Sequence, residues 1–224
     1  MKGEALQDRA LYYGDCLDWM RRWPDECADL IYLDPPFNSN ANYNIIFGTE
    51  NGAPAQVRGF NDTWKWDDKA AARVARLEAA VSNPLHDATV AFKRLLGPSG
   101  MLAYLTYMGE RLVEMRRLLK KTGSLYLHCD PTASHYLKAL MDDLFGHQNH
   151  RNEIIWERTT GRKSGRQYGR VHDVVLFYSK AKSNVWNSPT VPQSEDNVRG
   201  HDLMRDDGGM FRQSDFSGAT LSSD

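Results

Sequence analysis

The chain has 224 residues, of which 41% are hydrophobic and 25% are charged, and its net charge at pH 7 is −1. These values are ordinary for a soluble globular protein, and no apolar run approaches the roughly 20 residues that a membrane helix needs. The N-terminus lacks the apolar stretch of a signal peptide, and the odd count of three cysteines fits a reducing compartment. We therefore expect a cytoplasmic protein.

Short elements are expected in the first third of the chain. Residues 10–14 predict a short strand, and residues 16–22 predict a helix. The apolar run at residues 28–33 predicts a buried strand. Residues 38–66 are rich in Asn and Gly, and we expect a long loop, which in a compact domain is usually functional or mobile.

Helical patterns dominate the middle of the chain, and strands follow them. The expected elements are a helix at 67–96 interrupted at Asn83-Pro84, a helix at 110–121 ended by Gly123, a strand at 124–129, a helix at 131–145, and two strands at 153–156 and 173–178 that can pair antiparallel.

Strands that alternate with helices predict an α/β fold with a mostly parallel, doubly wound sheet, closed by an antiparallel hairpin. Residues 1–157 are expected to form the front half of a catalytic core, and residues 158–170 a basic loop. Residues 171–180 are expected to add a core strand. Residues 181–224 are polar, and we interpret them as a disordered tail or the start of a recognition region.

Asp34-Pro35-Pro36-Phe37 is the most informative feature of the sequence, because it directly follows the expected strand at 28–33. A proline has no N–H to donate to a sheet, so the chain must leave the sheet after Asp34. The sequence thus places a carboxylate, a rigid turn and an aromatic ring at the carboxyl end of a strand. Open α/β sheets bind their ligands at this edge.

These residue types suit chemistry on a planar amino group. The exocyclic nitrogen of a nucleobase is a poor nucleophile, because its lone pair is delocalised into the ring. Two acceptors on its N–H bonds favour a tetrahedral nitrogen, and the Asp34 carboxylate and the Pro35 carbonyl can supply them. Phe37 offers a face for stacking, worth about 1–3 kcal/mol per base. A base in a duplex must be flipped out to reach such a pocket.

The motif matches the (D/N/S)-P-P-(Y/F/W) pattern of amino-group DNA methyltransferases, which transfer a methyl group from S-adenosylmethionine to adenine N6 or cytosine N4. Its position near the N-terminus resembles the permuted β class. The resemblance implies a Rossmann-like methyltransferase fold, S-adenosylmethionine as cofactor, double-stranded DNA as partner and no metal. Further similar segments lie at residues 13–19, 123–130, 152–156 and 171–180.

The same resemblance implies the residues of the site. Asp34 and Pro35 are expected to accept hydrogen bonds from the target amino group, Pro36 to hold the turn, and Phe37 to stack on the flipped base. Asp15, Cys16 and Asp34 are expected to line the cofactor pocket. Asp15 alone is more typical of a helix cap, and capping does not exclude the second role. His128 and Asp130 end a strand near the same edge and are expected to be structural. The spacing of Cys16, Cys27 and Cys129 indicates no zinc site.

One segment of the family pattern is missing. Amino methyltransferases carry a Gly-rich turn that approaches the methionine part of the cofactor, and this sequence has none. In the permuted class that turn follows the recognition region. We therefore expect the front half of a longer enzyme or one part of a split enzyme, with the turn in a missing C-terminal half or a second chain. We expect this chain alone to bind S-adenosylmethionine weakly or not at all.

The segment at residues 158–170 is strongly basic and contains no acidic residue. Glycines and hydroxyl residues between the cations predict a loop that contacts DNA phosphates, with a solvated surface loop as the alternative. Its cationic residues are Arg158, Arg162, Lys163, Arg166 and Arg170.

The leading hypothesis is a site-specific DNA adenine-N6 methyltransferase of a restriction–modification system, or an orphan enzyme. Family members with Asp at the first motif position more often modify adenine. The alternatives are a cytosine-N4 methyltransferase, an enzyme that modifies RNA or a protein glutamine amide, and an inactive fragment or DNA-binding subunit of a split enzyme. The basic segment favours nucleic acid over protein as the substrate.

Overall fold

The computed structural model describes two compact units, Met1–Val185 and Trp186–Asp224. Only the backbone is described for the strands at 42–47, 55–61, 202–204 and 210–212. The described residues are 4–36, 42–47, 55–61, 64–158, 168–169, 171–188, 202–204 and 210–212.

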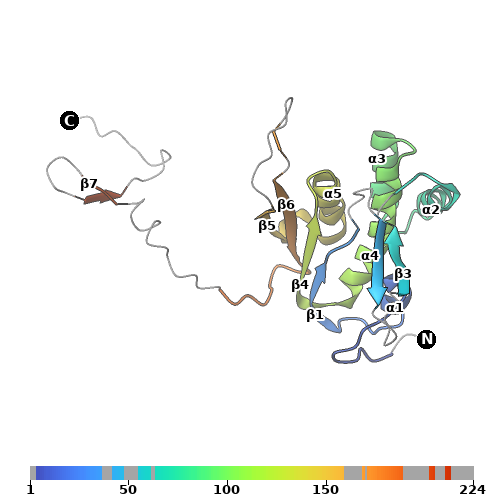
Figure 1. Cartoon of the computed structure of the whole chain (residues 1–224), viewed down its shortest axis with the longest axis horizontal. Coiled ribbons are helices and arrows are strands. Elements are labelled where there is room, and N and C mark those ends of the chain that lie inside the picture. Colours follow the sequence, from blue (N-terminus) through green and yellow to red (C-terminus); the bar gives the residue numbers. More distant parts are fainter. Residues whose placement is uncertain are drawn as a thin grey trace. The chain divides into compact units, whose positions relative to one another are not determined.

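A four-stranded sheet forms the centre of the first unit (Figure 1). β1 runs parallel to β4, whereas β6 runs antiparallel to both β4 and β5. The expected antiparallel hairpin of β5 and β6 is confirmed. The expectation of a mostly parallel sheet is wrong for these strands, because one of their three pairings is parallel. In spatial order the strands are β1 (Ala28–Leu33), β4 (Leu119–Cys129), β6 (His172–Ser179) and β5 (His150–Glu157).

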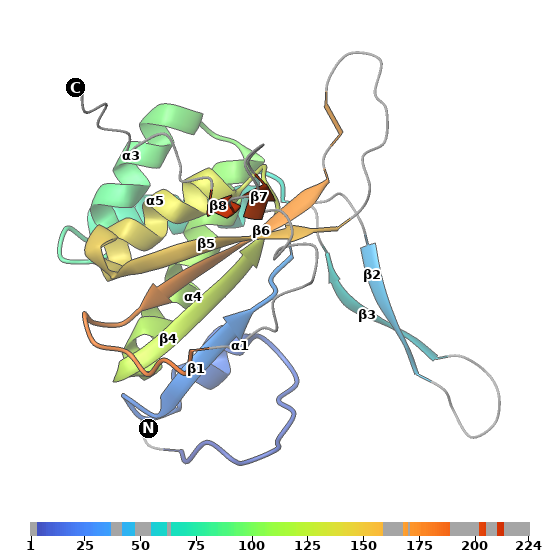
Figure 2. The same cartoon turned by 90° about the vertical axis from the view of Figure 1, so that its left-hand side faces the viewer.

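Helices lie along one face of this sheet and bury its apolar side chains. α4 (Gly100–Leu118) packs against β4, α5 (Ser134–Phe145) packs against β6, and α3 (His86–Leu96) packs against α4 (Figure 2). Alternate residues of β4 and β6 point toward them, as the period of a strand requires. The core that results contains the fully buried side chains of Leu125, Leu127, Leu176, Tyr178, Leu105, Leu112 and Leu137.

The opposite face of β1 is open. Leu30 and Tyr32 are each 59% exposed, whereas Ile31 and Leu33 pack against the core. The bounds predicted for this strand are confirmed, but its expected burial is wrong. β1 stands at the end of the strand order, so its outer edge has no partner among the described strands.

α4 is the central helix, and its first half was not predicted. It begins at Gly100, where the side chain of Ser99 accepts a hydrogen bond from the backbone of Leu102 at 3.2 Å. Almost every residue from Leu102 to Met108 is buried, so this part lacks the one-sided apolar stripe that marks an amphipathic helix. The predicted end is wrong, because Lys120 and Lys121 belong to β4.

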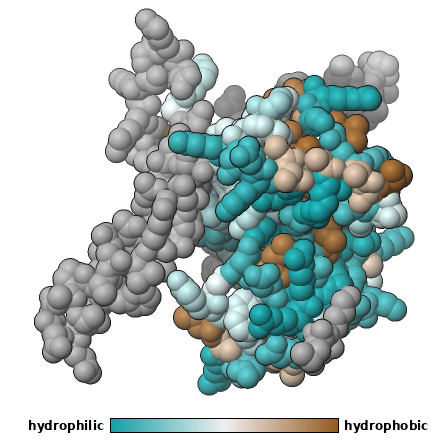
Figure 3. All heavy atoms as spheres, turned by 90° about the vertical axis from the view of Figure 1, so that its right-hand side faces the viewer, coloured by the Kyte–Doolittle hydropathy of each residue, from teal (hydrophilic) through white to brown (hydrophobic). Residues whose placement is uncertain are grey.

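The remaining helices follow their local signals. Asp67 caps α2 (Asp68–Ala79) by accepting a hydrogen bond from Ala70 N at 2.8 Å. The predicted interruption at Pro84 is confirmed, because α2 ends before it and α3 begins after it. The outer side of these helices is largely hydrophilic (Figure 3), as amphipathic helices over a core require. Among the described residues, no helix has the length and apolar character to cross a membrane.

Three segments correct the predicted strands. Residues 10–14 form no strand, and Leu11 is almost fully exposed. The expected loop at 38–66 contains an antiparallel pair, β2 (Asn42–Phe47) and β3 (Ala55–Asn61), which suits its β-branched and aromatic residues. In the second unit, β7 (Asp202–Met204) pairs antiparallel with β8 (Met210–Arg212), within the expected polar tail. The first unit also contains α1 (Cys16–Met20) and the short 3-10 helix η1 (His147–Asn149).

Candidate active site at the carboxyl end of β1

Asp34 and His128 meet at one edge of the sheet. β1 and β4 are parallel, so the residue that follows β1 lies beside the carboxyl end of β4. The Nδ1 atom of His128 lies 3.0 Å from Oδ1 of Asp34. With Asp34 ionised, this contact requires a proton on Nδ1, which donates to the carboxylate. The Asp34 side chain is 64% exposed, so the carboxylate is open to a ligand.

The turn that follows Asp34 is described only in part. Pro35 and Pro36 are half-buried and lie outside the sheet, as predicted from their missing N–H groups. Phe37, the expected stacking residue, lies outside the described residues.

A line of alternating charges continues from Asp34 across the sheet. The Nε2 atom of His128 lies 3.4 Å from Oδ2 of Asp173, a β6 residue whose side chain is only 4% exposed. Nη1 of Arg158 lies 3.3 Å from Oδ1 of Asp173. Acidic and basic side chains therefore alternate along one line, which consists of Asp34, His128, Asp173 and Arg158. We call these four residues the sheet-edge relay.

The sequence missed the role of Asp173 and expected His128 to be structural. Its contact with Asp34 now brings His128 into the candidate site. The available signal was its position one residue before the end of a strand expected at the same sheet edge. Asp130 fits its structural expectation, because its side chain accepts a hydrogen bond from Ala133 N at 3.1 Å before α5.

Asp15 has two structural roles. Its Oδ1 atom accepts a hydrogen bond from Leu17 N at 2.9 Å, which confirms that it caps α1. Both carboxylate oxygens also contact Nη2 of Arg111, at 2.7 and 2.8 Å. The sequence did not single out Arg111, because a cation in the middle of a helix carries no local sign of a distant partner.

Arg111 is held in an unusual environment for a cation. Its guanidinium carbon lies 3.2 Å from the centre of the Tyr107 ring, a cation–π arrangement. Burial raises the pKa of Tyr107 and the Asp15 charge adds to this, while the charge of Arg111 opposes the shift. Asp15, Arg111 and Tyr107 therefore form one electrostatic cluster between α1 and α4.

The cysteines differ in exposure. Cys16, an expected cofactor residue, is exposed in the first turn of α1. Cys129 is buried, and burial raises the pKa of its thiol to about 12. Within the described residues, no group of three or more His, Cys, Asp or Glu is arranged to hold a metal ion.

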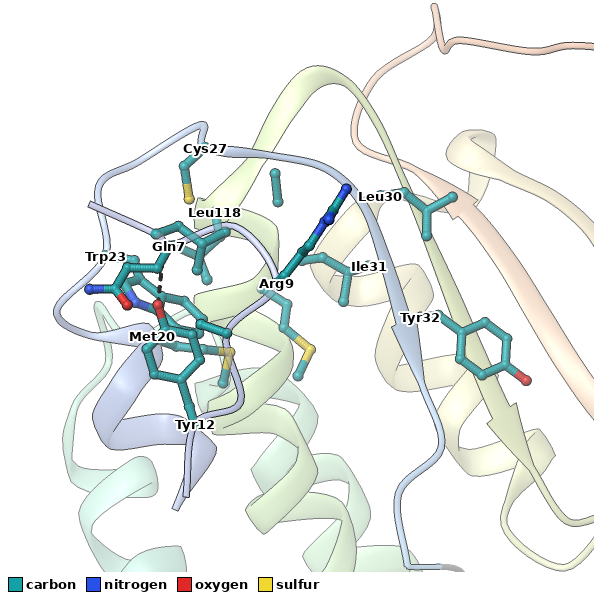
Figure 4. Close-up of a pocket in the computed structure, with 14 residues that line it drawn as sticks. Gln7, Arg9, Tyr12, Met20, Trp23, Cys27, Leu30, Ile31, Tyr32 and Leu118 are labelled. Carbon is teal, nitrogen blue, oxygen red and sulfur yellow. Dashed lines mark hydrogen bonds between the residues drawn. The ribbon is translucent and has the colours of Figure 1, made fainter. Parts of the chain in front are cut away.

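A cavity of about 420 Å³ lies beside β1 (Figure 4). Tyr12 and Trp23 line one side of it, and Leu30 and Ile31 line the other. Its described lining includes none of the expected base-binding or cofactor-binding residues. The cavity therefore adjoins the open edge of β1 rather than the tip where Asp34 lies.

The basic segment is described at its first residue. Arg158 is exposed but contacts Asp173, so this cation is engaged within the protein. Its expected partners in DNA binding, Arg162, Lys163, Arg166 and Arg170, lie outside the described residues.

Comparison with known proteins gives several relatives. The Mod subunit of the type III restriction-modification enzyme EcoP15I from Escherichia coli is 23% identical over 80% of this chain and 26% of its own length. The StyLTI Mod subunit from Salmonella typhimurium is 30% identical over 65% of this chain and 20% of its own length. The DNA adenine methyltransferase YhdJ from Escherichia coli is 20% identical over 82% of this chain and 45% of its own length.

The chain thus spans about a quarter or less of the length of the two Mod subunits. A family model described as DNA methylase matches residues 28–215, which include the DPPF motif and the whole central sheet. The expected amino-group methyltransferase resemblance is confirmed by this match. The chain therefore belongs to the N6/N4 DNA methylase family.

Proposed function

We propose that this chain supplies the base-binding site of a DNA adenine-N6 methyltransferase, which uses S-adenosylmethionine and acts on an adenine flipped out of duplex DNA. The observation that carries the proposal is the exposed Asp34 carboxylate at the tip of β1, directly before two prolines. The relative YhdJ is a DNA adenine methyltransferase, which favours adenine over cytosine as the substrate of this chain.

The proposed chemistry needs two acceptors and a way out for one proton. Asp34 and the Pro35 carbonyl accept the two N–H bonds of adenine N6, which turns the nitrogen lone pair toward the methyl donor. S-adenosylmethionine, when bound, would supply an electrophilic methyl group, and the electron pair of the broken carbon–sulfur bond would stay on its sulfur as a neutral thioether. After transfer the nitrogen carries one proton too many, and Asp34 accepts that proton and passes it to water, to which its side chain is open.

The cofactor would be held in part by Asp15. A carboxylate has about four acceptor positions. The described contacts use three of them, since Oδ1 accepts from Leu17 N and Arg111, and Oδ2 accepts from Arg111. One position remains on a side chain that is 47% exposed, which fits a hydroxyl or amino donor of the cofactor. Cys16, another expected cofactor residue, directly follows Asp15 in the chain.

Double-stranded DNA is the proposed partner, held by the basic segment that begins at Arg158. A second polypeptide, or a further part of the same one, is proposed to supply the Gly-rich cofactor turn. Support comes from the open edge and exposed face of β1, since an unpaired strand edge is a site where another strand can add. Proteins with a doubly wound sheet cover both faces of the sheet with further elements, so the open face of β1 offers a place for such elements.

The experiment is methylation of duplex DNA with labelled S-adenosylmethionine, followed by mass spectrometry of the nucleosides. We expect N6-methyladenine from the wild-type chain together with the polypeptide that carries the Gly-rich turn. Asp34→Ala should lower kcat by about 100-fold or more, because it removes a transition-state acceptor. Asp29→Asn, an exposed β1 residue paired with Lys120, is the matched control and should stay active.

Each alternative has its own outcome. N4-methylcytosine without methyladenine would overturn the adenine assignment. DNA binding without any methylated base, with every polypeptide of the system present, would favour the inactive or DNA-binding subunit.

A further inference from the structure

We infer that His128 is a positioning residue for Asp34, and that Asp173 and Arg158 hold its imidazole ring in place. This inference rests on the proposed function, in which Asp34 is the acceptor for the target amino group.

Asp34 needs a contact that holds its side chain in one orientation. It follows the last residue of an edge strand and is mostly exposed, so its two side-chain torsions are free unless something contacts the carboxylate. An acceptor for a developing charge must be preorganised, since reorganisation during the reaction adds to the barrier. The 3.0 Å contact from His128 Nδ1 to Oδ1 fixes the carboxylate and leaves Oδ2 for the substrate.

His128 is in turn held by its surroundings. Its ring is mostly buried between β1 and β6, with Asp173 on the side away from Asp34. A carboxylate as buried as that of Asp173 needs compensating charge or hydrogen bonds. His128 Nε2 and the Arg158 guanidinium both lie within ion-pair distance of it. The sheet-edge relay therefore orients the ring from the buried side outward.

The imidazole ring of His128 acts as a hydrogen-bond donor to Asp34. With a proton on Nδ1 the imidazole donates to Asp34 and stabilises its ionised form, and attraction between Nε2 and the Asp173 carboxylate requires a proton on Nε2 as well, because a bare ring nitrogen is an acceptor. An asparagine at position 128 keeps an N–H donor at nearly the place of Nδ1, whereas an alanine removes it. His128→Asn and His128→Ala therefore separate the donor from the ring.

The first experiment is NMR of the imidazole nitrogens in the 224-residue chain, without substrate. The His128 signals should show a protonated Nδ1, and they should shift in Asp34→Asn and in Asp173→Asn. They should not shift in Asp29→Asn, which removes the same charge from a residue of β1 that is paired with Lys120 instead of His128. Unchanged His128 signals in Asp34→Asn would overturn the inference.

The second experiment compares methylation kinetics in the system that is active under the proposed function. His128→Ala should lower kcat by about 10- to 100-fold, the range for losing a charge-assisted hydrogen bond. The KM values for DNA and cofactor should change little, by less than about threefold. His128→Asn should retain kcat within about threefold. His147→Ala, an exposed histidine after α5, should behave as wild type.

These outcomes distinguish failure of the positioning role of His128 from failure of the proposed function. Equal kcat in His128→Ala and wild type would refute the positioning role, as would a loss in a folded His128→Asn as large as that in His128→Ala. If no variant or wild type methylates DNA, the proposed function fails, and the NMR comparison alone decides whether His128 holds Asp34.

Discussion

Replacing Asp15 by Asn tests the cluster between α1 and α4. The substitution removes the negative charge that pairs with Arg111 but keeps a side-chain oxygen, and Asn caps a helix about as well as Asp. Arg111 is only 5% exposed, whereas Asp15 is 47% exposed. Breaking a fully buried pair costs about 3–5 kcal/mol and an exposed pair about 0–1 kcal/mol, so we expect about 2 kcal/mol here.

This loss is measurable by thermal and urea unfolding. For a chain of this size, 1 kcal/mol shifts the midpoint temperature by about 2–4 °C, so Asp15→Asn should lower it by about 4–8 °C. Asp18→Asn, an exposed acid in the first turn of the same helix, is the matched control and should shift it by less than about 2 °C.

A double mutant shows whether Arg111 is the cause. In the presence of Arg111→Met, the further change Asp15→Asn should cost less than about 1 kcal/mol, because no buried cation remains to be left unpaired. Equal midpoints for Asp15→Asn and Asp18→Asn would refute the reasoning, and so would full additivity in the double mutant.

Two further predictions concern side chains whose pKa is shifted. Cys16 should react with iodoacetamide at pH 8 in the folded chain while Cys129 stays unmodified, because burial raises the pKa of the Cys129 thiol to about 12; peptide mass mapping checks this, and equal labelling would contradict it. Burial raises the pKa of Asp142, but hydrogen bonds from Lys138 and Tyr178 outweigh burial and lower it below its ordinary value of 3.8. A carboxyl of this kind stabilises the fold above the unfolded-state pKa, and that stability is lost as pH falls through the folded-state pKa. Urea unfolding from pH 6 to pH 3 should therefore show a smaller fall in stability for Asp142→Asn than for wild type, and parallel curves would rule this out.

Local sequence signals were sufficient for several parts of the molecule. The apolar run before two prolines predicted the bounds of β1, since proline cannot continue a sheet. The hairpin of β5 and β6 and the break near Pro84 followed from short-range patterns in the same way. The DPPF motif and its flanking segments also predicted the family, which the match over residues 28–215 then showed.

The incorrect predictions concern segments whose burial does not follow from the local pattern of apolar and polar residues. α4 is buried on nearly all sides over its first half, so no one-sided apolar stripe in the sequence indicated a helix there. β1 carries apolar residues on both faces, which predicts burial, yet one face is open because no described element covers it. The apolar segment at residues 10–14 pairs with none of the described strands, and a strand needs a partner for its backbone hydrogen bonds.

By itself, the sequence determined which groups follow β1, because a carboxylate, two prolines and an aromatic residue are adjacent in the chain. Only the tertiary structure decided which groups surround that tip. His128 is 94 residues from Asp34, and Arg111 is 96 residues from Asp15. Contacts at such separations depend on strand register and on which helix packs against which strand, and neither is encoded in the spacing of neighbouring residues.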